Sequence, residues 1–246
     1  MKADTSRQWR LLDLQKLDTR LDQIAHRERT LPLNAQVQQA HTQTRTGEEE
    51  VVLARTALSD VDREITRADL DVQQVRDRAA RNQARLDGGQ GSSKDLQALQ
   101  HELEALARRQ GDLEDIELEV MERAEDLRTT LARREAELEA ARARLADLSE
   151  QRDAEVRELS AESDRIVGDR ANVAAGVGQD LLDLYTTIRD RRGGIGAAAL
   201  AQRRCGGCGL ELDQSELSRI RAAADDEVQR HEECSRILVR TTESGL

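Results

Sequence analysis

The sequence predicts a mainly α-helical protein, in which a long antiparallel coiled-coil hairpin precedes a small cysteine-containing module at the C-terminus. Three observations predict this class. The chain of 246 residues is 35% charged and 1% aromatic, with no Phe, which is typical of long helices rather than of a packed α/β enzyme. Apolar residues recur alternately three and four positions apart over two long runs. All 3 cysteines fall close to the C-terminus.

The two runs cover residues 35–86 and 94–166. In the first run, the repeat positions from Val37 to Leu86 are mainly β-branched residues and Ala. The repeat positions of the second run are mostly Leu. Large residues of one run would therefore lie opposite small residues of the other and fill one interface. A coiled-coil seam tolerates a few polar residues at a cost in stability. The polar interruptions of the second run are Gln110, Glu117, Arg134 and Arg152.

The segment between the runs predicts a turn over residues 87–93. It reads Asp-Gly-Gly-Gln-Gly-Ser-Ser, and each Gly costs about 1 kcal/mol in a helix. Ser92 or Ser93 is a suitable N-cap for the helix that follows. A short connection makes the two helices antiparallel neighbours. We therefore expect one hairpin over residues 1–176.

Residues 5–31 also show a helical apolar face, and Pro32 follows directly. A proline either kinks a helix or ends it. The near-equal lengths of the two arms favour a kinked two-arm hairpin over three independent helices, but the sequence leaves the kink and the turn open as alternatives.

The remaining residues, 177–246, are expected to form a short amphipathic helix around Leu181–Ile188 and a small metal-binding domain. Two pairs of candidate ligands, Cys205 with Cys208 and His231 with Cys234, each enclose two residues. Zinc prefers four tetrahedral nitrogen or sulfur ligands, and a structural site fills all four positions with protein. We therefore expect one structural Zn²⁺ ion in a zinc ribbon, with no open position for catalysis.

Two alternatives for this site stay open. A lone CxxC pair is also found in thioredoxin-like redox proteins, although no βαβ pattern surrounds this one. His231 is alternatively a bystander, which would leave a three-cysteine or degenerate site. Between the pairs, Asp213 to Glu216 is similar to a capping box and predicts a short helix. Residues 237–239 predict a strand that pairs with residues 199–201.

Composition also limits the function classes. A formal net charge of −11 argues against steering of the whole molecule toward nucleic acid or an anionic membrane. The apolar stretches are too short for a membrane span, and the N-terminus has no apolar signal core. Clustered cysteines without such a signal indicate a reducing compartment, so we expect a cytoplasmic protein. No nucleophile–base pair or phosphate loop is recognisable, and we expect neither an enzyme nor a small-molecule substrate.

The whole chain resembles a bacterial C4-type zinc-ribbon family that has an N-terminal coiled-coil hairpin. The segments that carry the resemblance are Leu11–Asp18, Asp95–Glu102, Cys205–Cys208 and His231–Val239. The family usually has Cys at the place of His231 and Gly at that of Ser235. The resemblance implies a chaperone or adaptor role, linked in some bacteria to an alternative sigma factor and to flagellar or secretion systems.

Our leading hypothesis is therefore a non-enzymatic adaptor or chaperone-like protein that binds protein partners through its coiled coil and ribbon. The alternative is a nucleic-acid-binding protein that uses the ribbon and an adjacent arginine cluster, although aromatic stacking residues are absent there. That cluster comprises Arg189, Arg191, Arg192, Arg203 and Arg204. Trp9 and Tyr185 are expected to pack where the hairpin base meets the ribbon, and His26, His41 and His101 to lie on helix surfaces or in the seam.

Overall fold

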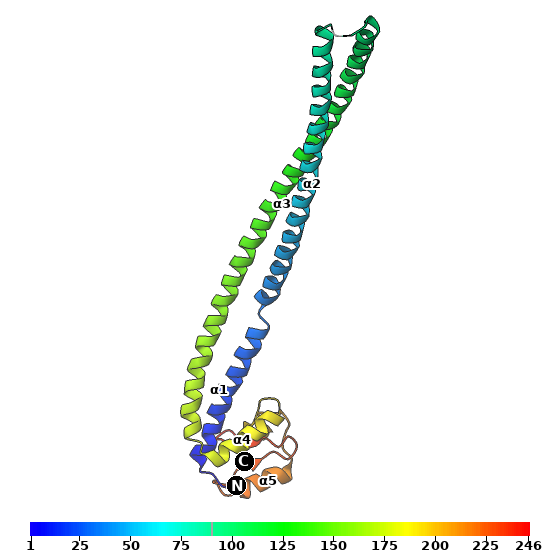
Figure 1. Cartoon of the computed structure of the whole chain (residues 1–246). Coiled ribbons are helices and arrows are strands. Elements are labelled where there is room, and N and C mark those ends of the chain that lie inside the picture. Colours follow the sequence, from blue (N-terminus) through cyan, green and yellow to red (C-terminus); the bar gives the residue numbers. More distant parts are fainter. Residues whose placement is uncertain (90) are drawn as a thin grey trace. The chain divides into compact units, whose positions relative to one another are not determined.

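A computed structural model describes residues 1–89 and 91–246. These residues form two compact units, of which the first comprises Met1–Asn34 with Glu150–Leu246 and the second Ala35–Ser149. The second unit consists of parts of two long helices, α2 (Pro32–Asp87) and α3 (Ser93–Ala175), which lie side by side (Figure 1). This division by packing differs from the division by sequence pattern at residue 176, because the hairpin base and the ribbon share one core.

The seam of the second unit follows the predicted repeat. Within Ala35–Ser149, every position of the two three–four repeats is buried or partly buried. Val61, Val120 and Ala124 form one of its apolar clusters, and Val72 is 1% exposed. The coiled-coil prediction is confirmed for both helices, because the period of the apolar residues matches the strip that each helix presents to the other.

Arginine–carboxylate pairs join α2 to α3 along both sides of this seam. Each such exposed pair adds little stability, but together they favour one antiparallel register. The pairs, with nitrogen–oxygen distances between 2.5 and 3.1 Å, are Arg55–Glu135, Arg76–Glu114, Arg78–Glu102, Arg123–Glu64, Arg128–Asp62, Arg134–Glu50 and Arg142–Glu48.

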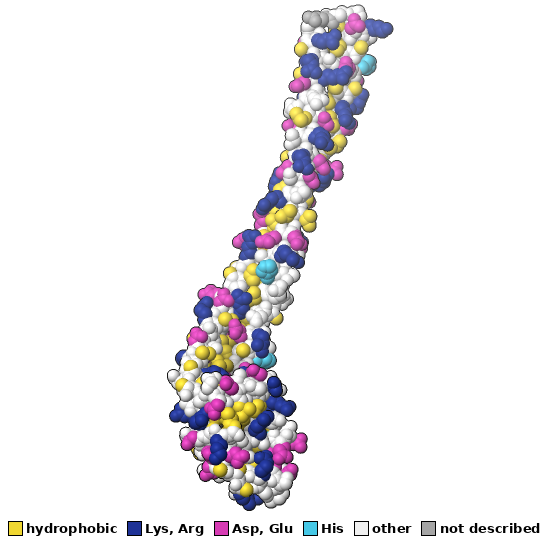
Figure 2. All heavy atoms as spheres, turned by 60° about the horizontal axis from the view of Figure 1, so that its bottom comes forward, with side chains coloured by type: hydrophobic (Ala, Val, Ile, Leu, Met, Phe, Trp, Pro, Cys, Tyr) yellow, Lys and Arg dark blue, Asp and Glu magenta, His cyan; other side chains and the backbone are white. Residues whose placement is uncertain are grey.

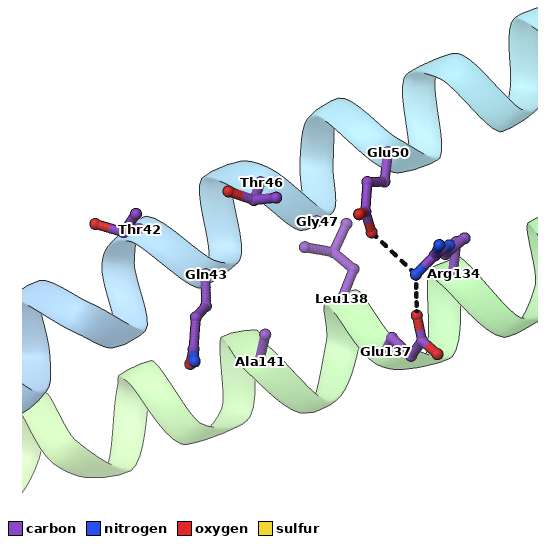
Figure 3. A pocket seen from close by; sticks show the side chains of 9 residues that line it. All are labelled: Thr42, Gln43, Thr46, Gly47, Glu50, Arg134, Glu137, Leu138 and Ala141. Atoms are coloured by element: carbon purple, nitrogen blue, oxygen red, sulfur yellow. Dashed lines mark hydrogen bonds and ion pairs between the residues drawn. The ribbon is translucent and has the colours of Figure 1, made fainter.

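One seam position of α2 is Gly47, which lies opposite Leu138. A Cβ atom at Gly47 would come within 3.3 Å of Leu138 Cδ1. A groove of about 260 Å³ lies beside this pair, where Leu138 points toward Gly47 and Arg134 lies between Glu50 and Glu137 (Figure 3). The small residue on α2 thus accommodates a large one on α3, as the sequence predicts for the two runs.

The expected turn over 87–93 includes residue 90, which lies outside the described residues. On either side, α2 ends at Asp87 and α3 begins at Ser93. Ser92 Oγ accepts from the amide of Asp95 at 3.4 Å, and the Asp95 carboxylate accepts from the amide of Ser92 at 2.9 Å. Ser92 is therefore the predicted cap of α3, and it forms a reciprocal capping box.

Pro32 begins a new helix rather than kinking a continuous one. Helix α1 (Thr5–Arg29) ends three residues before Pro32, and the amide of Thr30 donates to the carbonyls of His26 and Arg27. A proline in the first turn of a helix loses nothing, because its missing N–H would have no partner there. The structure thereby settles the alternative that the sequence leaves open.

The first unit contains a four-stranded sheet in the order β2-β1-β4-β3. Strands β1 (Ala197–Ala201) and β4 (Ile237–Arg240) pair in parallel, with Ala199 opposite Val239, as the sequence predicts. The short strands β2 (Arg204–Cys205) and β3 (Gln229–Arg230) add antiparallel edges. Helices α4 (Gln179–Arg191) and α5 (Gln214–Ala222) complete the unit.

Both faces of this sheet are covered. Ile237 and Val239 pack with residues of α1 and α4, whereas Leu238 packs with residues of α5 and the cysteines. Because side chains alternate between the two faces of a strand, three consecutive residues are all 0% exposed. The sheet therefore joins the metal-binding module to the base of the hairpin.

A buried polar network fixes this joint. Asp18 on α1 is 2% exposed and accepts from Arg170 Nε at 2.5 Å and from Tyr185 Oη at 2.7 Å. Gln15 Oε1 accepts from the amide of Gly196 at 2.8 Å, directly before β1. Burial and the Asp18 carboxylate raise the pKa of Tyr185, so its hydroxyl stays protonated and donates.

Trp9 lies close to the same joint. Its indole Nε1 donates to the carbonyl oxygen of Arg240 at 3.0 Å, while the side chain is 47% exposed. Trp9 and Tyr185 thus both lie where the hairpin base meets the ribbon, as the sequence predicts. Within the described ranges, no helix combines the length and apolar character needed to cross a membrane.

The seam predicts a contrast between two leucines on α3. Leu113 is 6% exposed and Leu118 is 58% exposed. Leu113→Ala should lower the free energy of unfolding by about 2 kcal/mol or more, because it opens a cavity in the seam. Leu118→Ala should change it by less than about 0.5 kcal/mol. Urea unfolding followed by circular dichroism measures both, and equal effects would contradict the observed register.

Candidate metal centre

The first pair of candidate ligands lies in a tight knuckle that begins at Cys205, the last residue of β2. The amide of Cys205 donates to Leu210 O at 2.9 Å, and that of Gly209 donates to Cys205 O at 2.8 Å. Gly209 has φ of +77°, a conformation that favours glycine. A Cβ atom at Gly207 would come within 2.7 Å of Arg236 Cδ and 3.1 Å of Ala198 Cβ, so a larger residue there would displace the Arg236 side chain.

The second pair lies between β3 and β4. The amide of His231 donates to Arg236 O at 3.0 Å, and that of Ser235 donates to His231 O at 2.8 Å. Ser235 has φ of 61°, so a non-glycine residue occupies the left-handed turn that ends the knuckle. This turn returns the chain into β4 and directs Cys234 toward the first knuckle.

All four candidate ligands come together. One ligand atom from each of Cys205, Cys208, His231 and Cys234 lies within 4.8 Å of the other three. The Sγ atoms of Cys205 and Cys234 are 3.9 Å apart, and His231 Nδ1 is 3.4 Å from Cys208 Sγ and 3.1 Å from Cys234 Sγ. Zinc–sulfur bonds of about 2.3 Å in a tetrahedron separate two sulfurs by roughly 3.8 Å. The donor set therefore fits a tetrahedral zinc ion held through Nδ1 of His231.

The thiols of this cluster differ in acidity. Burial raises the pKa of Cys205 to about 11, although the amides of Gly207 and Cys208 oppose that effect. Burial acts in the same direction on Cys234, but hydrogen bonds from the Arg236 amide and His231 outweigh it and lower the pKa to about 7. Thiolates packed this closely repel one another, and a divalent cation removes that repulsion.

Sequence reasoning missed one member of the site, Glu216. We expected a capping box at the start of α5, and Asp213 does accept from the amide of Glu216 at 2.7 Å. The Glu216 carboxylate instead reaches the second knuckle, where Oε1 accepts from the amide of Glu232 at 2.9 Å and Oε2 lies 3.8 Å from His231 Nε2. The sequence offered only a Glu at the third position of a predicted short helix, and nothing in it indicates that this side chain is buried.

Among the described residues, only part of the predicted arginine cluster is free of carboxylate partners and so available to bind phosphates. Arg189 pairs with Asp22 at 2.7 Å, and Arg204 pairs with Glu211 at 3.2 Å. Arg191, Arg192 and Arg203 are exposed. His26, His41 and His101 are also exposed, as expected of surface histidines, and none belongs to a metal-ligand cluster among the described residues.

Comparison with known proteins gives the family. A model of the CT398-like coiled coil hairpin domain matches residues 14–193. The chain belongs to this family. A second model, of the C4-type zinc ribbon domain, matches residues 204–238, which include all four candidate ligands. A C4 site has four cysteines, whereas this chain offers Cys205, Cys208 and Cys234 together with His231.

Relatives and solved structures agree with this assignment. An uncharacterized protein of Mycobacterium tuberculosis is 38% identical over 240 residues, which are 98% of each chain. A solved structure from Mycobacterium smegmatis is 35% identical with a TM-score of 0.87, over 98% of this chain and 100% of that one. CT398 from Chlamydia trachomatis has a TM-score of 0.70 at 15% identity, over 96% and 98% of the two chains, which shows a shared fold.

The position of Trp9 makes it a reporter of this centre, because it is the 1 tryptophan of the chain and its indole contacts the carbonyl of Arg240, the last residue of β4. Removal of zinc by a chelator, or Cys234→Ser, should unfold the knuckles and shift Trp9 emission to longer wavelength. The helical circular dichroism should persist, because α2 and α3 pack through their own seam. Glu233→Gln, an exposed change between the ligands, is the matched control.

Two results would contradict this expectation. One is unchanged Trp9 emission after elemental analysis has shown complete loss of metal. The other is a collapse of most of the helical signal together with the metal, because that would make the coiled coil dependent on the ribbon.

Proposed function

We propose that this protein is a non-enzymatic, zinc-binding adaptor or chaperone-like protein that binds protein partners through its coiled coil and ribbon. The observation that carries the proposal is a set of large apolar side chains exposed outside the seam of the coiled coil. They are Val52 (60% exposed), Leu53 (70%), Leu70 (56%) and Leu118 (58%).

These side chains lie outside the seam, whose repeat positions are occupied by other residues. Exposed apolar side chains are common one at a time, but Val52 and Leu53 are adjacent on α2, and Val52 borders a groove together with Leu138. Figure 2 shows acidic and basic side chains interspersed with apolar ones along the coiled coil. A protein partner with both apolar and charged groups suits this surface better than a strongly anionic ligand does.

Zinc has a structural role in this proposal. Three thiols and one imidazole fill a tetrahedron, so no position is left for a water or a substrate. The ion would tie the two knuckles together and hold the sheet, and hence α4, in place. The thiols must remain reduced to bind it, and we therefore place the protein in the cytoplasm.

A nucleic-acid-binding role is the second candidate, and the exposed Arg191, Arg192 and Arg203 are what supports it. Two of the five arginines in the cluster already pair with carboxylates, which lowers the positive charge available to phosphates. The surface near the ribbon also carries Glu211, which is 60% exposed at its side chain. We therefore rank protein partners first.

Site-specific photo-crosslinking in native cells tests the protein-binding role. A photoreactive residue at Leu53 should capture one reproducible protein, whereas the same residue at Gln73, an exposed polar position on the same helix, should not. Leu53→Ser should lower the yield of the captured complex without lowering the free energy of unfolding. Equal capture at both positions, or none at either, would count against the proposal.

Fluorescence anisotropy with single-stranded and duplex oligonucleotides tests the second candidate. Our account expects no binding at low ionic strength, or weak binding that the triple change of Arg191, Arg192 and Arg203 to Gln leaves unaltered. Tight binding that falls steeply with added salt and disappears in the triple variant would favour the nucleic-acid role instead.

A further inference from the structure

Glu216 is a buried acidic residue beside the candidate zinc site. It is 3% exposed, and its neighbour His231 is 1% exposed. An ionised side chain with so little access to water is costly unless polar groups surround it. The amide of Glu232 donates to Oε1, and Arg219 Nη2 lies 3.5 Å from the same oxygen. The second oxygen, Oε2, faces the imidazole ring.

The orientation of that ring gives this second oxygen a role. Nδ1 of His231 points to the sulfurs of Cys208 and Cys234, while Nε2 lies 3.8 Å from Glu216 Oε2. An imidazole that binds a metal through one nitrogen carries a proton on the other, and that proton needs an acceptor. A displacement of about 1 Å would bring Nε2 and Oε2 to hydrogen-bonding distance.

We propose that Glu216 is the positioning residue that allows histidine to serve as the fourth zinc ligand in this ribbon. Its carboxylate accepts the Nε2–H proton, fixes the tautomer that presents Nδ1 to the ion, and holds the ring in place. This inference rests on the zinc binding proposed above, and it adds a residue that a four-cysteine site would not need.

The charge around the proposed zinc ion also supports this role of Glu216. Replacing one thiolate of a four-cysteine site with a neutral imidazole removes one negative charge from around the ion. The Glu216 carboxylate returns a negative charge at the corner where the thiolate is missing. Arg219 offsets it only in part, because this side chain is 45% exposed and also pairs with Glu232 at 3.4 Å. A carboxylate beside a metal-bound imidazole raises the basicity of the ligand.

The test is a cycle of four full-length proteins: wild type, Glu216→Gln, His231→Cys and the double variant. Competition with a chromophoric chelator measures the zinc dissociation constant of each. Glu216→Gln should weaken zinc binding about 10- to 100-fold in the wild-type background. In the His231→Cys background the same change should have less than about a threefold effect, because a thiolate has no N–H to position.

Glu232→Gln is the matched control. This substitution removes another carboxylate that pairs with Arg219. The Glu232 side chain, however, is 61% exposed and does not contact the His231 ring. It should leave the zinc dissociation constant within about threefold of that of the wild type. A control variant that binds zinc as weakly as Glu216→Gln would overturn the proposal, since the effect would then follow from the Arg219 ion pairs.

Nitrogen-15 spectroscopy of histidine-labelled, zinc-loaded wild-type protein gives a readout that does not depend on how any variant folds. His231 should show a metal-bound Nδ1 and a slowly exchanging Nε2 proton, whereas the exposed His26, His41 and His101 should exchange rapidly. A metal-bound Nε2 would overturn the proposal.

The remaining outcomes separate this inference from the function on which it rests. If the wild type binds no zinc, the proposed zinc role and the inference fail together. If the wild type binds zinc but Glu216→Gln binds it equally well, or weakens it equally in the His231→Cys background, only the role of Glu216 fails. In the last case Glu216 would support the knuckle whatever the fourth ligand is.

Discussion

Four donor atoms within 4.8 Å of one another, three of them sulfur, impose the main constraint on the C-terminal sheet and its knuckles. Thiolates held this close repel one another unless a cation lies between them. Burial raises the pKa of Cys205, whereas hydrogen bonds from the Arg236 amide and His231 lower that of Cys234. The strands on either side contain between 2 and 5 residues, too few to define a stable sheet alone. The parallel pairing of β1 with β4 brings the two knuckles together, and a shared ion would in turn hold that pairing.

The same sheet also packs against the base of the hairpin, so the position of the hairpin base depends on the sheet. One of its faces packs against α5 and the ligands, and the other packs against α1 and α4. Gln15 and Asp18 then fix the entry to β1 and the position of α4 through buried hydrogen bonds. The ribbon is therefore not an independent domain, because it shares a hydrophobic core with the base of the hairpin. A partner that binds the ribbon would contact a surface whose shape depends on both the ligand site and the first helix.

Much of this fold could be predicted from the sequence, because each predicted part depends on local spacing. Three–four repeats define the seam, glycines define the turn, and paired ligands at fixed spacing define the knuckles. Glu216 could not be found in this way. Its carboxylate does not close the predicted capping box but accepts a hydrogen bond from the amide of Glu232, in the second knuckle. In the sequence, Gln15 and Asp18 stood out only because they belong to the segment Leu11–Asp18 that resembles the family. Nothing in the sequence indicated that they are buried. Their burial depends on α4 and on the end of α3, which no local pattern brings to α1.

The proposed adaptor role requires a rigid ribbon, and that rigidity depends on His231 as a true ligand. X-ray absorption at the zinc edge of the purified, reduced protein is the most direct test. Our account predicts three sulfur atoms at about 2.3 Å and one nitrogen at about 2.0 Å, with the outer-shell scattering of an imidazole. His231→Cys should lose that imidazole signal and gain a fourth sulfur. A wild-type spectrum without imidazole scattering, or one with six light-atom ligands, would contradict the account.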